Sequence, residues 1–427
     1  MREMKDSGVY WIGDIPEKWN LLPVKRFFRA EKRIVGNAVN EYERLALTMK
    51  GVIKRSKDDS EGLQPEKFEG YQILRENELV FKLIDLENVK TSRVGLSSYT
   101  GLVSPAYIVL SNNQQDNRFY YYWFMFMYYN EVFNQLGGAG VRSALSAKDV
   151  CLLPVPSISH DEQRKIADYL DDKCSKIDMI IEKQEKIIEK LKEYRTSFIT
   201  EKVTKGLNLN QKYQDSGLDW AGQIPDTWRV TRINRIGKTT SGATPLRNKD
   251  EEFFQDANVR WVRTLDLNDW LVTDSSEKIT DVALNSSSCN IMPIDTVCVA
   301  MYGGAGTIGK CGILKAESAT NQAVCSIVLY NDVIPEYLLF QLIALRKFWM
   351  KFAVGTRKDP NISQDTVGRM PILIPSIKEQ ESIVNFIIPF CEKIDRNIDF
   401  RSTLIKKYNA YKKSLIYECV TGKKEVC

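Results

Sequence analysis

The sequence predicts an α/β protein in which two β-rich blocks are joined by two long antiparallel helices, as a pseudo-twofold tandem duplication. Three observations predict this class: the length, a repeat that spans both halves, and two heptad patterns. The chain has 427 residues, 43% of them hydrophobic and 27% charged, which is typical of a folded globular protein with several domains. Its net charge of +5 is too small to indicate an anionic partner by itself.

The repeat begins with a short motif near the N-terminus. Residues 6–19 read DSGVYWIGDIPEKW, and residues 215–228, 209 positions later, read DSGLDWAGQIPDTW. Eight of these fourteen positions are identical. A long-period repeat fixes the architecture before any local assignment is made, so the two halves should share one plan.

A second pair of matching segments follows each block at an offset of 217. Glu162-Gln163 and Lys176-Ile177-Asp178 recur as Glu379-Gln380 and Lys393-Ile394-Asp395, and the match continues to Val203-Thr204 and Val420-Thr421. The two offsets differ by only eight residues, so the chain contains one unit twice. Each copy is a variable block followed by a long periodic segment.

The periodic segments predict helices of about 43 residues, or about 65 Å at ~1.5 Å per residue. Apolar residues recur with the alternating spacing of a coiled-coil seam. The seam positions that we expect to bind a partner helix or partner subunit are Ile177, Ile181, Ile188, Leu191, Ile394, Ile398, Ile405 and Tyr408. The apolar stripe is narrow, so a helical partner is favoured over the alternative that each helix packs on its own block. The simplest partner is the other copy, running antiparallel.

The blocks themselves share a coarse order and little sequence. Each has β-rich segments, an aromatic helix (near 118–136 and 335–354) and a Gly-Arg loop at Gly140-Val-Arg142 or Gly355-Thr-Arg357. Basic residues cluster in both blocks, although for any one of them a solvated surface role is the simpler interpretation. Two related loops on a pseudo-symmetric protein nevertheless suit a DNA duplex that is read at two separated half-sites.

Tests for catalytic chemistry are negative. Residues 304–311 read GAGTIGKC, which resembles a phosphate-binding loop, but strands are expected on both sides of it, so we predict a glycine-rich hairpin. His160 is the single histidine and has no recognisable catalytic partners. The nine cysteines show no CxxC spacing, so we expect no zinc site, no disulfide framework and a reducing, cytoplasmic location. The aromatic stretch 119–129 is too short to span a bilayer and is expected to be a buried helix.

Taken together, these motifs resemble the specificity subunit of type I restriction-modification systems over essentially the whole chain. The resemblance rests on the doubled Gly-x-Ile-Pro-x-x-Trp motif, on Ser241 to Pro245, on the Tyr302 to Lys310 hairpin with Thr320-Asn-Gln322, and on the Pro-Ser-Ile turns before the Glu-Gln helices. The first block departs from the family because it lacks the Gly-x-Thr-Pro element.

The resemblance implies four segments. Residues 1–155 and 211–372 would be target recognition domains, and residues 156–210 and 373–427 would be spacer helices that also dock partner subunits. The residues that we expect to contact DNA are Lys50, Lys54, Arg55, Arg93, Arg142 and Lys148 in the first block, and Thr244, Arg247, Arg263, Tyr302, Lys310, Arg357 and Lys358 in the second.

The resemblance also implies a function without catalysis in this chain. The chain would read an asymmetric bipartite site in double-stranded DNA and scaffold two DNA-methyltransferase subunits and two restriction-translocase subunits, in the cytoplasm and away from membranes. S-adenosylmethionine, ATP and Mg²⁺ would bind those partners, with no cofactor or metal in this chain. The leading alternative is a structural adaptor that assembles proteins through its helices and does not bind DNA. A second alternative is a nucleotide-dependent enzyme that uses the loop at 304–310.

Overall fold

The computed structural model describes residues 2–49, 51–57, 67–84, 86, 93–112, 114–136, 144–208, 210–246, 250–303, 306–355 and 360–426. The chain divides into two compact units: residues 1–184 with 402–427 (unit 1), and residues 185–401 (unit 2). Each unit is described by itself. The division cuts the two long helices, whereas the limits expected from the sequence follow the repeat and remain predictions.

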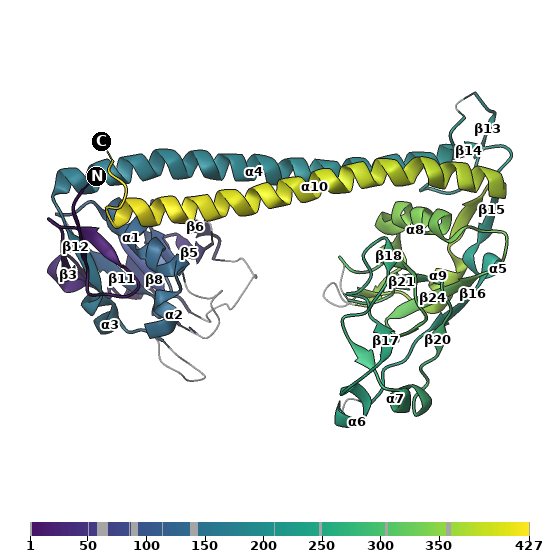
Figure 1. Cartoon of the computed structure of the whole chain (residues 1–427), viewed down its shortest axis with the longest axis horizontal. Helices are drawn as coiled ribbons and strands as arrows, with labels where there is room; N and C mark the ends of the chain where they lie inside the picture. The colour runs from purple at the N-terminus through teal and green to yellow at the C-terminus, as the bar shows by residue number, and fades with distance from the viewer. Residues whose placement is uncertain are drawn as a thin grey trace. The chain divides into compact units, whose positions relative to one another are not determined.

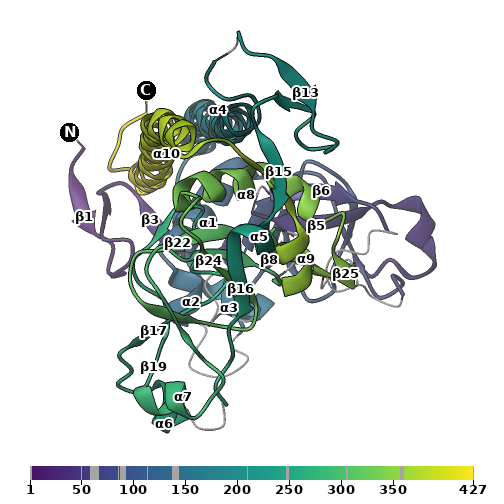
Figure 2. The same cartoon turned by 90° about the vertical axis from the view of Figure 1, so that its right-hand side faces the viewer.

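The long helices are α4 (His160–Lys205) and α10 (Ile377–Val420). They lie side by side in both views (Figures 1 and 2). In unit 1, Lys412 of α10 forms an ion pair of 2.6 Å with Asp178 of α4. In unit 2, Arg195 of α4 forms one of 3.2 Å with Asp395 of α10. In each unit the N-terminal half of one helix therefore pairs with the C-terminal half of the other, which confirms the antiparallel arrangement.

The two units share one strand order, except that the second sheet of unit 2 has one additional strand, β18. In unit 1 the sheets are β6-β5-β10-β7 and β4-β11-β8-β9, and in unit 2 they are β19-β17-β23-β20 and β16-β24-β21-β22-β18. The strands of unit 1 are β1 (Met4–Asp6), β2 (Asp14–Pro16), β3 (Asn20–Pro23), β4 (Arg29–Ala30), β5 (Arg44–Thr48), β6 (Gly51–Arg55), β7 (Gln72–Leu74), β8 (Leu79–Lys82), β9 (Arg93–Leu96), β10 (Gly101–Val103), β11 (Ile108–Ser111) and β12 (Pro154–Ser157). Its short helices are α1 (Asn117–Tyr129), α2 (Val132–Leu136) and α3 (Ala147–Leu152), with 3-10 turns at Val24–Arg26 and Gly36–Glu41.

Unit 2 repeats this plan with additional short elements. Its strands are β13 (Tyr213–Asp215), β14 (Gln223–Pro225), β15 (Arg229–Arg232), β16 (Gly237–Ser241), β17 (Val259–Val262), β18 (Leu271–Val272), β19 (Lys278–Ile279), β20 (Ile291–Met292), β21 (Val297–Ala300), β22 (Cys311–Leu314), β23 (Ser318–Thr320), β24 (Val324–Leu329), β25 (Val354–Gly355), β26 (Pro360–Asn361) and β27 (Pro371–Ile374). Its helices are α5 (Ile233–Ile236), α6 (Asp250–Phe254), α7 (Asp281–Asn285), α8 (Pro335–Trp349) and α9 (Gln364–Arg369).

The repeated N-terminal motif forms the same structure twice. β1 pairs with β2 and β13 with β14 in matching antiparallel registers, Asp6 opposite Asp14 and Asp215 opposite Gln223. The tryptophan that closes each motif, Trp19 or Trp228, is 3% exposed. Trp19 lies beside Gly422 after α10, and Trp228 lies beside Gly206 after α4. Both glycines have a positive φ, as is usual just beyond a helix C-terminus.

The aromatic helices form the cores beneath the long helices. Eight residues of α1, including Trp123 and Phe124, are buried, as predicted for this segment. The helix expected near 118–136 breaks at Asn130 and Glu131, because Glu131 takes a left-handed conformation (φ 57°) between α1 and α2. The second helix ends at Trp349 and not near 354, where β25 begins. Among the described residues, no helix is both long and apolar enough to cross a membrane.

Candidate nucleic-acid interface

Several loops of unit 2 meet at one edge of its five-stranded sheet. In the ladders Ser241 faces Cys325, Ala300 faces Val324, and Val299 faces Cys311, so the segments beyond these residues all leave from the same side. The parallel strands β17 and β23 end there as well, because the amide of Asn321 donates to the carbonyl of Val262. We call residues 242–246, 263–266, 301–303, 306–310 and 321–323 the loop edge of unit 2.

The backbone before Thr244 is held tightly at this edge. A Cβ on Gly242 would lie 1.7 Å from the carbonyl oxygen of Thr320, so only glycine fits there. The next residue, Ala243, donates its amide to that carbonyl at 3.0 Å and accepts from the indole of Trp261 at 3.1 Å. Thr244 is therefore an exposed side chain on a fixed backbone.

The glycine-rich segment is a hairpin, as predicted, since β21 and β22 pair antiparallel with Val297 opposite Ile313. Trp349 of α8 packs against this hairpin just before β22, where a Cβ on Gly309 would lie 2.2 Å from the indole ring. Arg346, one turn earlier on α8, donates to the carbonyl of Gly309 at 3.2 and 3.3 Å and forms an ion pair with Asp269. A nucleotide-binding loop would need a helix directly after it, and β22 stands in that place.

The Arg346–Asp269 pair is partly buried, so burial and the two opposite charges both affect the pKa of Asp269. Burial raises the pKa of the Asp269 carboxyl, but the hydrogen bonds and charge of Arg346 outweigh burial and hold that pKa below its usual value. The neighbouring thiol of Cys311 has its pKa raised by burial and then by the Asp269 charge, so it stays protonated at neutral pH. The cluster supports the hairpin and presents no reactive thiolate.

The predicted contact residues of unit 2 divide into two groups. Thr244, Tyr302 and Lys310 lie on the loop edge, and Tyr302 is 40% exposed. Arg263 also lies there, but its guanidinium is engaged by Glu277 at 2.5 Å and by the hydroxyl of Ser276 at 3.0 Å.

In unit 1 the predicted residues are spread more widely. Arg93 begins β9 opposite Lys82, at the edge that corresponds to the loop edge of unit 2. Lys54 and Arg55 lie on β6, toward the end of the β5–β6 hairpin away from its turn, and Lys54 pairs with Glu43 at 2.5 Å. Lys148 is exposed on α3. Lys50, Arg142, Arg247, Arg357 and Lys358 lie outside the described residues.

The helix-seam residues are all at least partly covered. Ile177 and Ile394 are buried at 5% and 8% exposure, and Ile181, Ile188, Leu191, Ile398, Ile405 and Tyr408 are intermediate. Ile177, Ile181 and Tyr408 pack in the core of unit 1, and the role of the seam residues in binding a further subunit remains a prediction. Two tyrosines at equivalent positions, Tyr194 and Tyr411, are instead 54% and 53% exposed.

The structure reveals two positions that sequence reasoning did not assign. Gln163 and Gln380 are almost fully buried. Gln163 accepts from the amide of Asp116 at 3.0 Å, and Gln380 accepts from the amide of Ile334 at 3.0 Å, so each long helix is tied to the start of its aromatic helix. Their identity across the repeat was the available signal.

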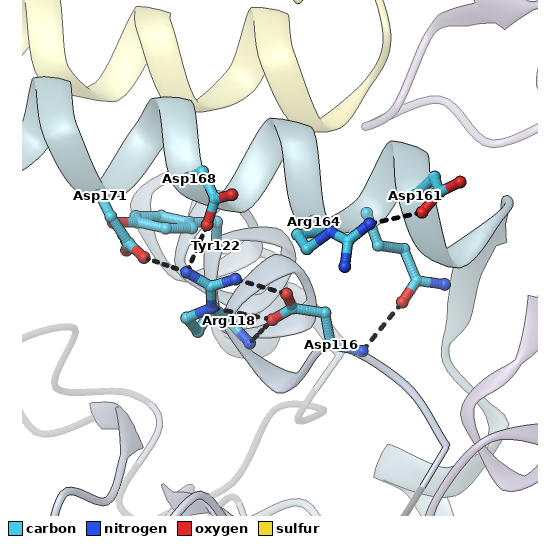
Figure 3. A network of polar contacts seen from close by, with 8 residues as sticks. Asp116, Arg118, Tyr122, Asp161, Arg164, Asp168 and Asp171 are labelled. Atoms are coloured by element: carbon cyan, nitrogen blue, oxygen red, sulfur yellow. Dashed lines mark hydrogen bonds and ion pairs between the residues drawn. The ribbon is translucent and has the colours of Figure 1, made fainter.

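A charged cluster around Arg118 was missed entirely (Figure 3). Its guanidinium contacts Asp116, Asp168 and Asp171 at 2.6 to 2.9 Å, and Asp171 also accepts from the hydroxyl of Tyr122 at 2.7 Å. These acceptors raise the pKa of Arg118 further above its ordinary value, with the hydrogen bond to Asp116 as the largest cause. The cluster joins α1 to α4 within unit 1, and no sequence pattern marked it. Among the described residues, no cluster of side chains could hold a metal ion.

Comparison with known proteins identifies a family and several relatives to which this chain is similar. Residues 225–403 match the family described as the type I restriction modification DNA specificity domain. The EcoR124I/EcoR124II specificity subunit of Escherichia coli is 24% identical over 269 residues, which cover 60% of this chain and 63% of that protein. The EcoKI specificity subunit of Escherichia coli K12 is 23% identical over 296 residues, covering 66% of this chain and 58% of that protein. The chain thus matches less than two thirds of the length of these relatives.

A solved structure gives the same result for the fold. A chain from work on complex assembly and conformational transition of the type I R-M system covers 95% of this chain and 98% of its own length, with a TM-score of 0.66 and 12% identity. Residues 225–403 thus match a type I DNA specificity domain. The chain is similar to type I restriction-modification specificity subunits, as the sequence motifs predicted.

Proposed function

We propose that this chain is the DNA-reading subunit of a type I restriction-modification complex and recognises an asymmetric bipartite site. The observation that carries this proposal is that two blocks with a shared strand order have different residues in the described parts of the corresponding loops. Two similar folds that carry different loop residues suit two half-sites of different sequence. The reason is that base readout depends on the side chains that reach the groove.

The proposal assigns no catalysis to this chain. Two methyltransferase subunits and two restriction-translocase subunits would supply it, with S-adenosylmethionine, ATP and Mg²⁺ bound to them, in the cytoplasm. Partners present in two copies need two equivalent surfaces. The pairs Asp178–Lys412 and Arg195–Asp395, which are equivalent in the repeat, and the exposed Tyr194 and Tyr411 support such doubled docking.

The test is DNA binding by the full chain with its methyltransferase partner at stated salt concentrations. We expect a sequence preference of at least 10³-fold over random duplex, in the range of specific DNA-binding proteins. Binding without any preference would contradict the proposal and favour the adaptor function. Mapping methylated adenines in the host genome would then give both half-sites.

A further inference from the structure

Gln322 is an exposed side chain at the centre of the loop edge of unit 2. It lies in the turn between β23 and β24, and the hydroxyl of Thr244 donates a hydrogen bond to its carboxamide oxygen. Because Met301 donates its amide to the carbonyl of Ala323 at 2.7 Å, the backbone of Tyr302 runs beside that of Gln322. The edge thus carries Thr244, Gln322 and Tyr302 in a row.

The backbone that carries Gln322 is as constrained as the one that carries Thr244. The amide of Asn321 donates to Val262 at 3.1 Å, the side-chain oxygen of Asn321 accepts from Ala323 at 3.2 Å, and the amide of Val324 donates back to Asn321 at 3.1 Å. An exposed glutamine is ordinarily free to sample many rotamers. Here the backbone and the Thr244 hydroxyl both restrict it, which is the arrangement expected of a recognition group.

The hydrogen-bonding capacity left on Gln322 selects a ligand class. Thr244 occupies one lone pair of the carboxamide oxygen, so one acceptor site and the two N–H donors of the amide remain. A phosphate offers acceptors only and would leave the oxygen unused. The major-groove edge of adenine offers an acceptor, N7, beside a donor, the N6 amino group, which matches a carboxamide in bidentate geometry.

We propose that Gln322 reads an adenine in the major groove of the half-site bound by unit 2, with Thr244 as its positioning residue. This inference rests on the proposed function and adds a contact residue and a base. Tyr302 would lie beside the adenine contact, on the side of Gln322 opposite Thr244.

The experiment uses full-length chain with its methyltransferase partner and the half-sites selected from a random duplex library. Each adenine of the unit 2 half-site is replaced in turn by 7-deazaadenine, which lacks the N7 acceptor. We expect wild-type affinity to fall about 5- to 150-fold at one position. The Gln322→Ala variant should bind the natural site with a similar loss and should be insensitive to the replacement at that position.

Two further variants test the role of Thr244. Thr244→Val should weaken discrimination at the same base pair, and Thr244→Ser, which keeps the hydroxyl, should restore it. Recognition of the other half-site serves as the internal control for folding. Loss of affinity that is uniform across sequences would identify a backbone contact and overturn the inference, as would wild-type binding by Gln322→Ala. Failure of the wild-type protein to prefer any sequence would instead overturn the proposed function.

Discussion

Units 1 and 2 build the same sheets from sequences that hardly match. The order β6-β5-β10-β7 corresponds to β19-β17-β23-β20, and in both units a parallel pair, β5 with β10 or β17 with β23, sits inside an otherwise antiparallel sheet. The edges differ: the strand end that leads to Thr244 in unit 2 leads to Ile34 in unit 1, and the turn with Gln322 corresponds to Ser104 to Tyr107. The comparison teaches that strand order is retained while the edge is free to vary.

Residues identical in the two copies serve the shared scaffold. Trp19 and Trp228 close the ends of the long helices, and Gln163 and Gln380 tie their starts to the blocks. The Arg118 cluster of unit 1 has no counterpart in unit 2, since Asp168 and Asp171 correspond to Asn385 and Ile388. Unit 2 contains the Arg346–Asp269 pair in addition to the shared scaffold.

The largest expected effect concerns the Arg346–Asp269 pair of unit 2. Arg346→Met leaves the partly buried carboxylate of Asp269 without its cation, which should destabilise unit 2 by about 3 kcal/mol, the lower end of the cost of breaking a buried ion pair. Urea unfolding followed by hydrogen exchange in each unit measures the change. Lys347→Met, which removes an exposed charge from the same helix, is the matched control, and equal losses for both variants would contradict the assignment.

The same pair predicts a pH dependence. The pKa of Asp269 is below its usual value in the folded state, so the pair contributes stability above the unfolded pKa of about 3.9 and loses it as the pH falls through the folded value. Wild-type unit 2 should therefore lose this contribution below about pH 4. The stability difference between wild type and Arg346→Met should narrow over the same range, and a constant difference would contradict this origin.

The second effect concerns the backbone of the loop edge of unit 2. Gly242→Ala forces a Cβ against the carbonyl of Thr320, which should cost about 3 kcal/mol and displace Thr244. DNA recognition by unit 2 should fall with stability, while unit 1 is unaffected. Gly368→Ala, whose Cβ would make only ordinary contacts of 3.5 Å, is the control. A stable Gly242→Ala variant would show that the loop has room to move.

The third effect tests whether the two glutamines are equivalent. Gln163→Leu and Gln380→Leu each leave the amide of Asp116 or Ile334 unpaired inside the protein, at a cost of about 2 kcal/mol. Hydrogen exchange should localise each loss to its own unit, with similar size. A large loss in one unit alone would mean that the repeat conserves the residue without conserving its role.

Much of this fold could be predicted because the two copies of the repeat can be compared within one sequence. The repeat and the antiparallel helices followed from periodicity and from residues that recur at fixed offsets. The hairpin of β21 and β22 followed from the strands expected on both sides of the glycine-rich segment. The break at Glu131 could not be predicted, since it depends on one positive φ in an otherwise helical sequence. The loop edge was only partly predicted: Thr244 and Tyr302 were expected from a motif, but Gln322 acquires its orientation from Thr244, 78 residues away in sequence. Contacts of that range leave no local pattern.

The smallest expected effect tests the symmetry of the helix pair itself. Lys412→Ala in unit 1 and Arg195→Ala in unit 2 each remove one member of a repeat-related ion pair whose carboxylate is about half exposed, so each should cost at most about 1 kcal/mol. Raising the salt concentration should shrink both effects together, because exposed charges are screened. Exchanging the charges of Asp178 and Lys412 should restore most of the stability lost in Lys412→Ala, since the antiparallel pairing only requires opposite charges to face each other. If the exchange destabilised the protein more than the single substitution, the cross-helix contact would not be the interaction that matters, and Lys412 would act through the tyrosines of α1 that line the same pocket.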